Sequence, residues 1–203
     1  MSKLASKGEA TREAILDVAI ELAREVGLSA LTIGALAERA SMSKSGLFAH
    51  FGAKEALQLA VLRAAQARFD DAVIREAFKA PRGLARLREL FQRWLAWAAV
   101  QPKPGGCLML AAASEFDDRP GEVRDFLASQ QLAWLAGLAR TVTFAIEAGE
   151  LPADCDVEQF AFEIFGLILS THHHVRLLSD PAFIQRAESG LSRLISAPPR
   201  RSA

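Results

Sequence analysis

Apolar residues recur at helical spacing along almost the whole chain, and no segment alternates convincingly between apolar and polar residues. A spacing of three and four residues places apolar side chains on one face of a helix, whereas a half-buried strand alternates with a period of two. The chain is therefore expected to be all-α. Hydrophobic residues make up 51% of its 203 residues, which is enough to bury a substantial core.

Turn-forming residues divide this pattern into segments. Gly27 is expected to end a first helix, Thr32 to cap a helix over 33–40, and Ser43 to cap a helix over 44–50. Residues 1–10 are expected to form a loose arm and 197–203 a short tail. Glycine and proline runs, the clearest at 102–106, separate the remaining helices. These helices are expected over 54–79, 83–100, 107–115, 121–148, 156–178 and 182–195.

The two short helices on either side of Ser41-Met42-Ser43 have the spacing of a helix-turn-helix motif. The second of them is uncharged except for Lys44, and small residues at its start let its backbone approach a DNA duplex closely. The formal net charge of the chain is zero, but no acidic residue lies between Arg39 and Lys54. This stretch is expected to supply a local basic surface. The alternative is a three-helix bundle that binds nothing.

The run from Thr11 to Leu57 resembles the N-terminal domain of the TetR/AcrR family of regulators. The residues that carry the resemblance are Thr11, Arg12, Ile15, Leu16, Gly27, Thr32, Ile33, Ala37, Ala40, Ser43, Gly46, Leu47, His50, Phe51, Lys54, Glu55 and Leu57. Residues 105–127 resemble C-terminal domains of that family less specifically. The resemblance implies a three-helix helix-turn-helix DNA-binding domain over 1–53 and a helical effector-binding and dimerisation domain over 54–203.

The resemblance also implies roles for single residues. Contacts to DNA phosphates are implied for Thr32, Ser43, His50 and Lys54, and positions facing base edges for Lys44, Ser45, Gly46 and Ala49. Three departures matter. Ser41 and Met42 stand where the family commonly has Gly-Val, and both still fit, at a cost in stability if position 41 needs a positive φ. Phe48 replaces the usual tyrosine, so it can touch the sugar-phosphate edge but cannot donate a hydrogen bond.

These features predict a ligand-responsive transcriptional regulator, favoured as a repressor, that binds a near-palindromic double-stranded DNA operator as a homodimer. The sequence leaves the effector, the operator and the choice between repressor and activator open. A DNA-binding dimer that is controlled by a protein partner, or not controlled, is the alternative. The chain has no G-x-S-x-G, P-loop, dinucleotide or H-E-x-x-H motif, so neither catalysis nor a cofactor is expected.

Aromatic residues are concentrated between residues 54 and 148. An apolar or aromatic effector is expected to bind among them, with ordinary core packing as the alternative. The expected lining residues are Phe69, Phe91, Trp94, Trp97, Phe116 and Trp134.

The helix expected over 156–178 has two apolar stripes. One stripe can face its own domain, and the other needs a partner. With the last helix and their two-fold mates, these stripes predict a four-helix dimer interface. Its expected residues are Phe160, Ile164, Leu167, Thr171, His174, Leu191 and Leu194. In the alternative, one chain covers both stripes.

The run His172-His173-His174 is the remaining feature that suggests a metal. Adjacent residues on a helix diverge by about 100°, so they cannot all face one ion, and no metal site is expected. Cys107 has the pattern of a buried small residue more than of a redox sensor. No signal core or membrane-length apolar run occurs in the sequence, so a cytoplasmic protein without a membrane partner is expected.

Overall fold

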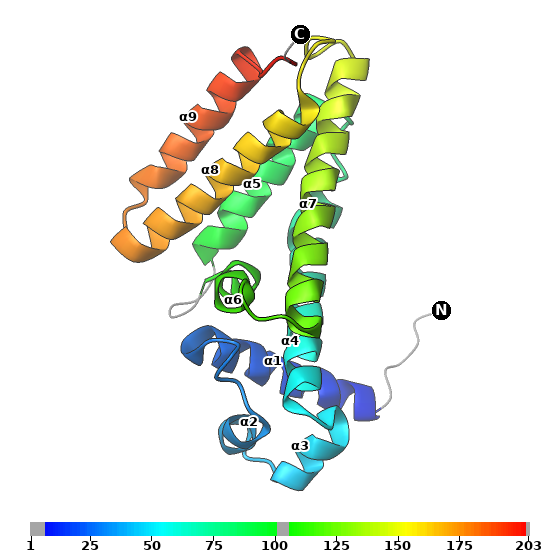
Figure 1. Ribbon diagram of the computed structural model, residues 1–203, viewed down its shortest axis with the longest axis vertical. Helices are drawn as coiled ribbons and strands as arrows, with labels where there is room; N and C mark the ends of the chain where they lie inside the picture. Colours follow the sequence, from blue (N-terminus) through cyan, green and yellow to red (C-terminus); the bar gives the residue numbers. More distant parts are fainter. Residues whose placement is uncertain (1–6, 101–105, 202–203) are drawn as a thin grey trace. The chain divides into compact units, whose positions relative to one another are not determined.

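The computed structural model describes residues 7–100 and 106–201, and these residues form an all-α fold (Figure 1). No β-strand occurs among them, and a single bridge joins Cys155 to Arg200. The elements in chain order are α1 (Lys7–Val26), α2 (Ile33–Ala40), α3 (Lys44–Phe51), α4 (Lys54–Phe69), η1 (Asp70–Arg75), α5 (Leu84–Val100), α6 (Leu108–Phe116), α7 (Glu122–Glu147), α8 (Val157–Leu178) and α9 (Ala182–Ser196).

The chain forms two compact units. The head unit comprises Met1–Arg68 and Gln101–Ser129, and the second unit comprises Phe69–Val100 and Gln130–Ala203. The units do not coincide with the domain boundary expected between residues 53 and 54. Most of α4, all of α6 and the start of α7 pack with the first three helices, because their apolar faces complete the core of the head unit.

Local sequence signals set the ends of the first helices. Gly27 ends α1 with φ +88°, and its N–H bonds to the carbonyl of Ala23 at 2.9 Å. Such a backbone conformation favours glycine because it is strained for residues with a Cβ. The expected arm is shorter than predicted, since α1 already begins at Lys7. The rest of the arm, and most of the 102–106 turn, lie outside the described residues.

The helix expected over 54–79 changes its hydrogen bonding partway along. The α-helix ends at Phe69 and continues as the π-helix η1, and helical structure stops before Phe78. A π-helix closes each hydrogen bond over one residue more than an α-helix does. The wider turn leaves Val73 and Ala77 fully buried. Periodicity does not reveal such a change because the apolar spacing stays close to helical.

In the second unit, α8 packs between α5 and α9 (Figure 1). The helices α8 and α9 approach closely at Gly190, where a Cβ would lie 2.7 Å from Leu167 Cδ2. The C-terminal segment is fixed rather than loose as far as it is described. The N–H of Asp156 bonds to the Pro199 carbonyl at 2.8 Å, and the N–H of Arg201 bonds to the Asp154 carbonyl at 3.0 Å.

Candidate DNA interface

The helix-turn-helix is built from two side-chain caps and one left-handed residue. The Thr32 hydroxyl accepts a hydrogen bond from Ala35 N–H at 3.1 Å, and the Ser43 hydroxyl accepts one from Gly46 N–H at 3.1 Å. Both caps were expected, and both are present. Between the helices, Ser41 has φ 51° and ψ 40°, a conformation that favours glycine. The turn therefore carries the strain that its serine predicts.

The helix α3 is divided between a buried and an exposed side. Leu47 is fully buried and Phe51 is nearly so, in the core of the head unit. The guanidinium of Arg12 lies 5.4 Å from the centroid of the Phe51 ring, which places a further cation near α3. Arg12 is one of the residues that carry the family resemblance, but it was not expected to contact DNA. The residues of α3 that are exposed to solvent are Lys44, Ser45, Phe48, Ala49 and His50.

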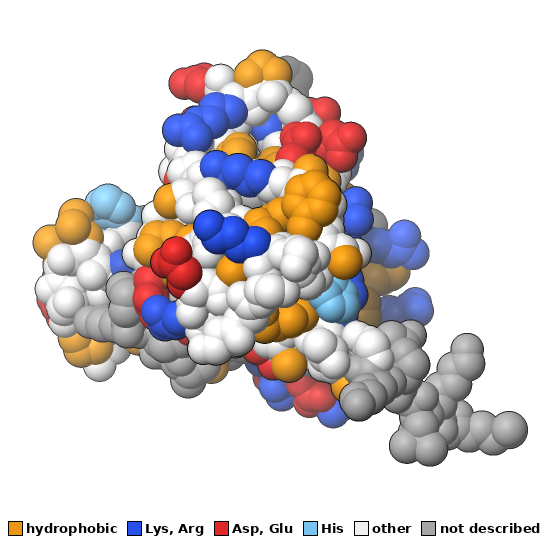
Figure 2. All heavy atoms as spheres, turned by 90° about the horizontal axis from the view of Figure 1, so that it is seen from below, with side chains coloured by type: hydrophobic (Ala, Val, Ile, Leu, Met, Phe, Trp, Pro, Cys, Tyr) orange, Lys and Arg blue, Asp and Glu red, His pale blue; other side chains and the backbone are white. Residues whose placement is uncertain are grey.

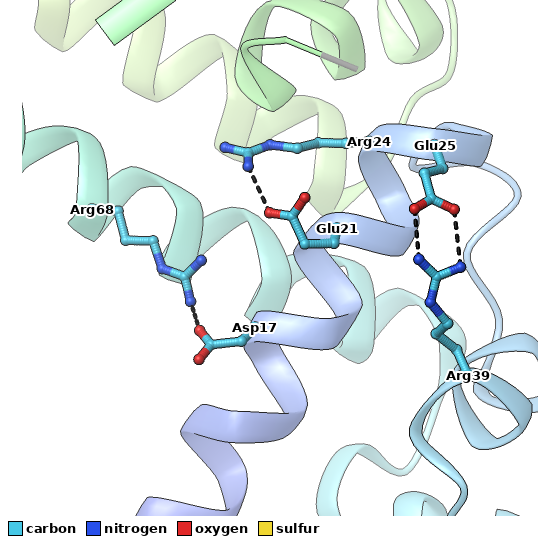
Figure 3. A network of polar contacts seen from close by, with 6 residues as sticks. All are labelled: Asp17, Glu21, Arg24, Glu25, Arg39 and Arg68. Atoms are coloured by element: carbon cyan, nitrogen blue, oxygen red, sulfur yellow. Dashed lines mark hydrogen bonds and ion pairs between the residues drawn. The ribbon is translucent and has the colours of Figure 1, made fainter. Parts of the chain in front are cut away.

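The charge of this surface differs from the sequence expectation. No acid lies between Arg39 and Lys54 in the sequence, but Glu25 of α1 reaches Arg39 in space. The Arg39 guanidinium donates to both oxygens of Glu25, at 3.0 and 2.6 Å (Figure 3). This hydrogen bond and the charge of Glu25 raise the pKa of Arg39. The charge of Arg39 is therefore compensated, which the linear sequence concealed.

On the face shown in Figure 2, lysine and arginine side chains are separated by uncharged and apolar ones and lie beside acidic ones. Two more ion pairs occur on α1. Arg24 pairs with Glu21, and Arg68 of α4 pairs with Asp17 (Figure 3). The Arg24 side chain is mostly buried, whereas the Arg68–Asp17 pair is exposed and adds little to stability. The surface is a mixed one rather than a continuous basic patch, so shape and specific contacts must contribute much of the recognition of any DNA partner.

The turn between α1 and α2 is held by side chains from later helices. The carboxylate of Glu115 in α6 accepts hydrogen bonds from the N–H groups of Leu28 at 3.1 Å and Ser29 at 2.8 Å. From α4, Gln58 donates to the Leu28 carbonyl at 2.8 Å, and Lys54 donates to the Ser29 carbonyl at 2.6 Å. Lys54 is thus engaged within the head unit, and it is also exposed. Sequence reasoning missed Glu115 because its partners lie more than 80 residues away.

The aromatic residues expected to line one pocket fall into separate places. In the second unit, the Phe69 ring meets the rings of Trp97 and Trp134 edge-on, with centroids 5.9 and 5.4 Å apart. Phe91 and Trp94 are buried in that unit as well. Phe116, by contrast, packs in the core of the head unit, so it is not part of this cluster. Packing between residues far apart in the sequence decides which unit each aromatic residue joins, and the spacing of apolar residues along the chain does not reveal it.

One atom of this aromatic cluster is unusual. The indole N–H of Trp97 is buried and has no hydrogen-bond partner among the described residues. A buried donor without a partner costs free energy, and such groups are rare in folded proteins. The Phe69, Trp97 and Trp134 cluster therefore offers an apolar surface with one unused donor.

The residues of α8 and α9 that were expected at the dimer interface are mostly not exposed. Most of the residues expected at the dimer interface are buried within the chain, namely Phe160, Ile164, Thr171, Leu191 and Leu194. Leu167 and His174 are half-buried: Leu167 lies against Gly190, and His174 stacks on Phe183 at 4.4 Å. These five residues are therefore covered within their own unit, whereas Leu167 and His174 stay partly exposed, and the dimer interface itself stays a prediction. The large apolar residues of α8 that are exposed are Phe162, Leu169, Leu177 and Leu178.

The histidine run is dispersed, as helical geometry requires. His172 is half-buried, and burial and the nearby Arg176 lower its pKa. His173 is exposed, and His174 stacks on Phe183. Across residues 7–100 and 106–201, no group of three or more His, Cys, Asp and Glu side chains is placed to hold a metal ion. Both cysteines are buried and neither forms a disulfide, and burial raises the pKa of Cys155.

None of the helices in the described part of the chain is long and apolar enough to span a membrane.

Comparison with known proteins agrees with this architecture. Residues 15–61 match the family model of bacterial regulatory proteins of the tetR family, and residues 83–191 match that of the tetracyclin repressor-like C-terminal domain. No curated protein matches the chain.

Solved structures share the fold over nearly the full length. A TetR-family regulator from Chloroflexus aurantiacus has a TM-score of 0.83 at 23% identity, covering 97% of this chain and 99% of its own. One from Cytophaga hutchinsonii has a TM-score of 0.80 at 21% identity, covering 98% and 100%. AibR, solved with isovaleryl coenzyme A and operator DNA, has a TM-score of 0.70 at 20% identity, covering 90% and 96%. With both family models matched in order along it, the chain belongs to the TetR family of transcriptional regulators.

Proposed function

We propose that this chain is a ligand-responsive repressor that binds a near-palindromic operator as a homodimer. The observation that carries the proposal is the exposed side of α3. It presents Lys44, small polar groups and an apolar ring, it holds no acidic residue, and the Ser43 cap fixes the start of the helix. A short helix of this kind, preceded by a tight turn, fits the major groove of DNA.

The DNA contacts divide into two sets in this proposal. Thr32, Ser43, His50 and Lys54 fix the register on the phosphates, and Lys44, Ser45, Gly46, Phe48 and Ala49 meet the base edges and the groove wall. Lys44 reads guanine O6 or N7. The ammonium group of Lys54 donates one hydrogen bond to the Ser29 carbonyl, at 2.6 Å, and its other N–H groups can donate to a phosphate at the same time.

Dimerisation is proposed through the outer face of α8 and α9, with a changed set of residues. Phe162 and Leu169 are 65% and 42% exposed, and Gly166 lies between them with open space beside it. A groove of about 540 Å³ follows this face between the two helices and is lined by Phe162, Glu163, Gly166, Leu167, Gly190, Arg193, Leu194 and Ala197. Exposed large apolar residues beside a groove suit burial against a second copy.

The effector is proposed to be apolar or aromatic and to bind in the second unit. The cluster of Phe69, Trp97 and Trp134 supports this proposal, since it combines apolar rings with the unused indole N–H of Trp97. AibR, whose structure holds both isovaleryl coenzyme A and operator DNA, is a precedent of this fold for a protein that takes both kinds of partner.

An effector can release the operator only if it binds more tightly to a dimer whose two head units have a spacing that does not fit the operator. Two chain connections carry such a preference toward the head unit: α4 runs on into η1, and the chain passes from α5 into α6. The helix α6 matters because Glu115 holds the turn before α2. We expect the protein to act in the cytoplasm, without catalysis and without a cofactor.

The experiment is a selection of operators by the full-length protein from a library of random DNA duplexes, followed by footprinting of the selected site. We expect two related half-sites, separated by a helical turn or a multiple of it, and one protein dimer bound. Metabolite pools are then added to the complex. Release by a small molecule supports the sensor, whereas release only by a protein supports a regulator that is controlled by a partner.

A further inference from the structure

The helix α3 carries apolar side chains on both of its sides. Leu47 and Phe51 are buried in the core of the head unit, but Phe48 is 59% exposed and Ala49 is exposed beside it. More than half of the surface of this phenylalanine stays in contact with water in the folded unit. Its position on the face that meets DNA in the proposed function suggests that the ring serves recognition.

Helical geometry places the exposed residues in two rows. Residues four apart lie on the same side of a helix, and successive residues turn by about 100°. Ser45 and Ala49 form the row that points most directly away from Leu47 and Phe51, and Lys44 and Phe48 form the row beside it. These two rows combine one ammonium group, one hydroxyl, one methyl and one phenyl ring, and the exposed His50 lies on the other side of the row of Ser45 and Ala49.

This combination fits a particular set of base edges. Thymine is the one base whose major-groove edge carries an apolar group, its C5 methyl, and side chains such as alanine and phenylalanine contact that methyl. Guanine presents the acceptors that suit a lysine. Phe48 has no hydroxyl, so it cannot bond to a phosphate, and the methyl of Ala49 has no polar partner to satisfy.

We propose that α3 recognises thymine through its C5 methyl, which contacts the ring of Phe48 and the methyl of Ala49, next to a guanine that Lys44 reads. This inference rests on the proposed function and deepens it. The charges on the head unit support this inference. Because Glu25 compensates the charge of Arg39, attraction to phosphates contributes less to DNA binding, and contacts to the bases contribute more.

The test begins from the operator that the full-length protein selects from random duplexes. Each thymine of a half-site is replaced in turn by deoxyuridine, which pairs identically and lacks only the methyl group. We expect at least one replacement in each half-site to weaken binding about three- to fivefold, the amount that follows from losing contact with one buried methyl group. Replacements outside the half-sites leave the affinity unchanged.

Protein variants then assign the methyl contacts to side chains. Phe48→Ala removes the sensitivity to deoxyuridine at one thymine, and Ala49→Gly removes it at another. Phe48→Tyr is the matched control, because it keeps the ring and keeps the sensitivity. Glycine also weakens the helix, but that effect lowers binding to both operators equally and cancels in their ratio.

The outcomes separate this inference from the function on which it rests. A selected operator that has no thymine in its half-sites, or whose half-site thymines tolerate deoxyuridine, overturns the inference and leaves operator binding standing. Sensitivity that persists unchanged in both Phe48→Ala and Ala49→Gly overturns it as well. If the protein selects no specific sequence, the proposed function itself fails.

Discussion

The helices α3 and α8 both carry apolar residues on more than one side, but they expose them differently. In α3, eight residues long, two apolar residues are buried and a single large ring is exposed among small and charged groups. In α8, 22 residues long, two stripes are buried and a further line through Phe162 and Leu169 is exposed beside Gly166.

This difference separates two kinds of recognition. A mixed face with one lysine suits the polar edges of base pairs, because each group can meet a different partner. A line of large apolar side chains with a glycine beside it suits contact with another protein, because apolar side chains of that partner can pack closely against it. The comparison predicts that substitutions on α8 change assembly and stability, whereas substitutions on α3 change which DNA is bound.

The largest expected effect separates the two sides of α8. Phe160 is fully buried and Phe162 is 65% exposed, two residues further along. Phe160→Ala should lower the free energy of unfolding by about 3–5 kcal/mol, because it leaves a cavity in the second unit. Phe162→Ala, the matched control, should leave the folded chain intact and weaken the dimer. Chemical denaturation at several protein concentrations and sedimentation distinguish the two.

The Phe160→Ala loss of unfolding free energy should be the same at all protein concentrations. The Phe162→Ala loss should be greatest where the wild-type protein is dimeric and should disappear once dilution has dissociated both proteins. Equal losses for the two variants, or a dimer that Phe162→Ala does not weaken, would contradict the assignment of the faces of α8.

The next effect concerns α3. Lys44→Ala should lose about 1–3 kcal/mol of discrimination at one base pair, because it removes a contact to a base edge. Lys54→Ala should weaken binding to all sequences alike, since its expected partner is a phosphate. Competition binding between operator variants measures both. If Lys44→Ala left the preferred sequence and the affinity unchanged, α3 would not be the reading helix.

A smaller effect concerns the turn between α1 and α2, which Glu115 of α6 holds. Glu115→Gln keeps the shape of the side chain but presents one acceptor and one donor to the N–H groups of Leu28 and Ser29. It should lower the free energy of unfolding by about 1–2 kcal/mol and should speed hydrogen exchange at those two amides. Glu13→Gln, which neutralises an exposed carboxylate on α1, is the control for charge. Equal exchange in both variants would remove Glu115 from this role.

The smallest expected effect is a gain. Phe48→Tyr restores the hydroxyl that the family commonly has at this position, and it should tighten binding to all sequences by less than about 1 kcal/mol, because water competes for the phosphate. Titration of one operator by both proteins measures the gain. Weaker or equal binding at unchanged thermal stability would mean that the ring of residue 48 does not reach the backbone of DNA.

The ends of the helices were predictable from sequence where the signals are local. Gly27, Thr32 and Ser43 end or cap helices as expected, because a cap depends on residues three or four positions away. The left-handed backbone of Ser41 also has a local cause, because it follows from the tight turn that this residue occupies. The all-α fold followed from the helical period alone.

Features that depend on distant contacts were not predictable. Glu25 compensates Arg39 across 14 positions, and Glu115 reaches Leu28 across 87. Periodicity identified two apolar stripes on α8 but could not tell which neighbour covers each one. Leu167 was expected at a dimer seam, whereas it lies against Gly190 of its own chain. Substitution of Phe162 is therefore a cleaner probe of dimerisation than substitution of Leu167.

The most direct test is the affinity of the full-length protein for its selected operator, measured by fluorescence anisotropy against a duplex of the same composition in scrambled order, at several salt concentrations. We expect one dimer per operator, affinity at least about a thousandfold above that for the scrambled duplex, and weaker binding as salt rises. Equal affinity for the two duplexes at every salt concentration would contradict sequence-specific DNA binding by this chain.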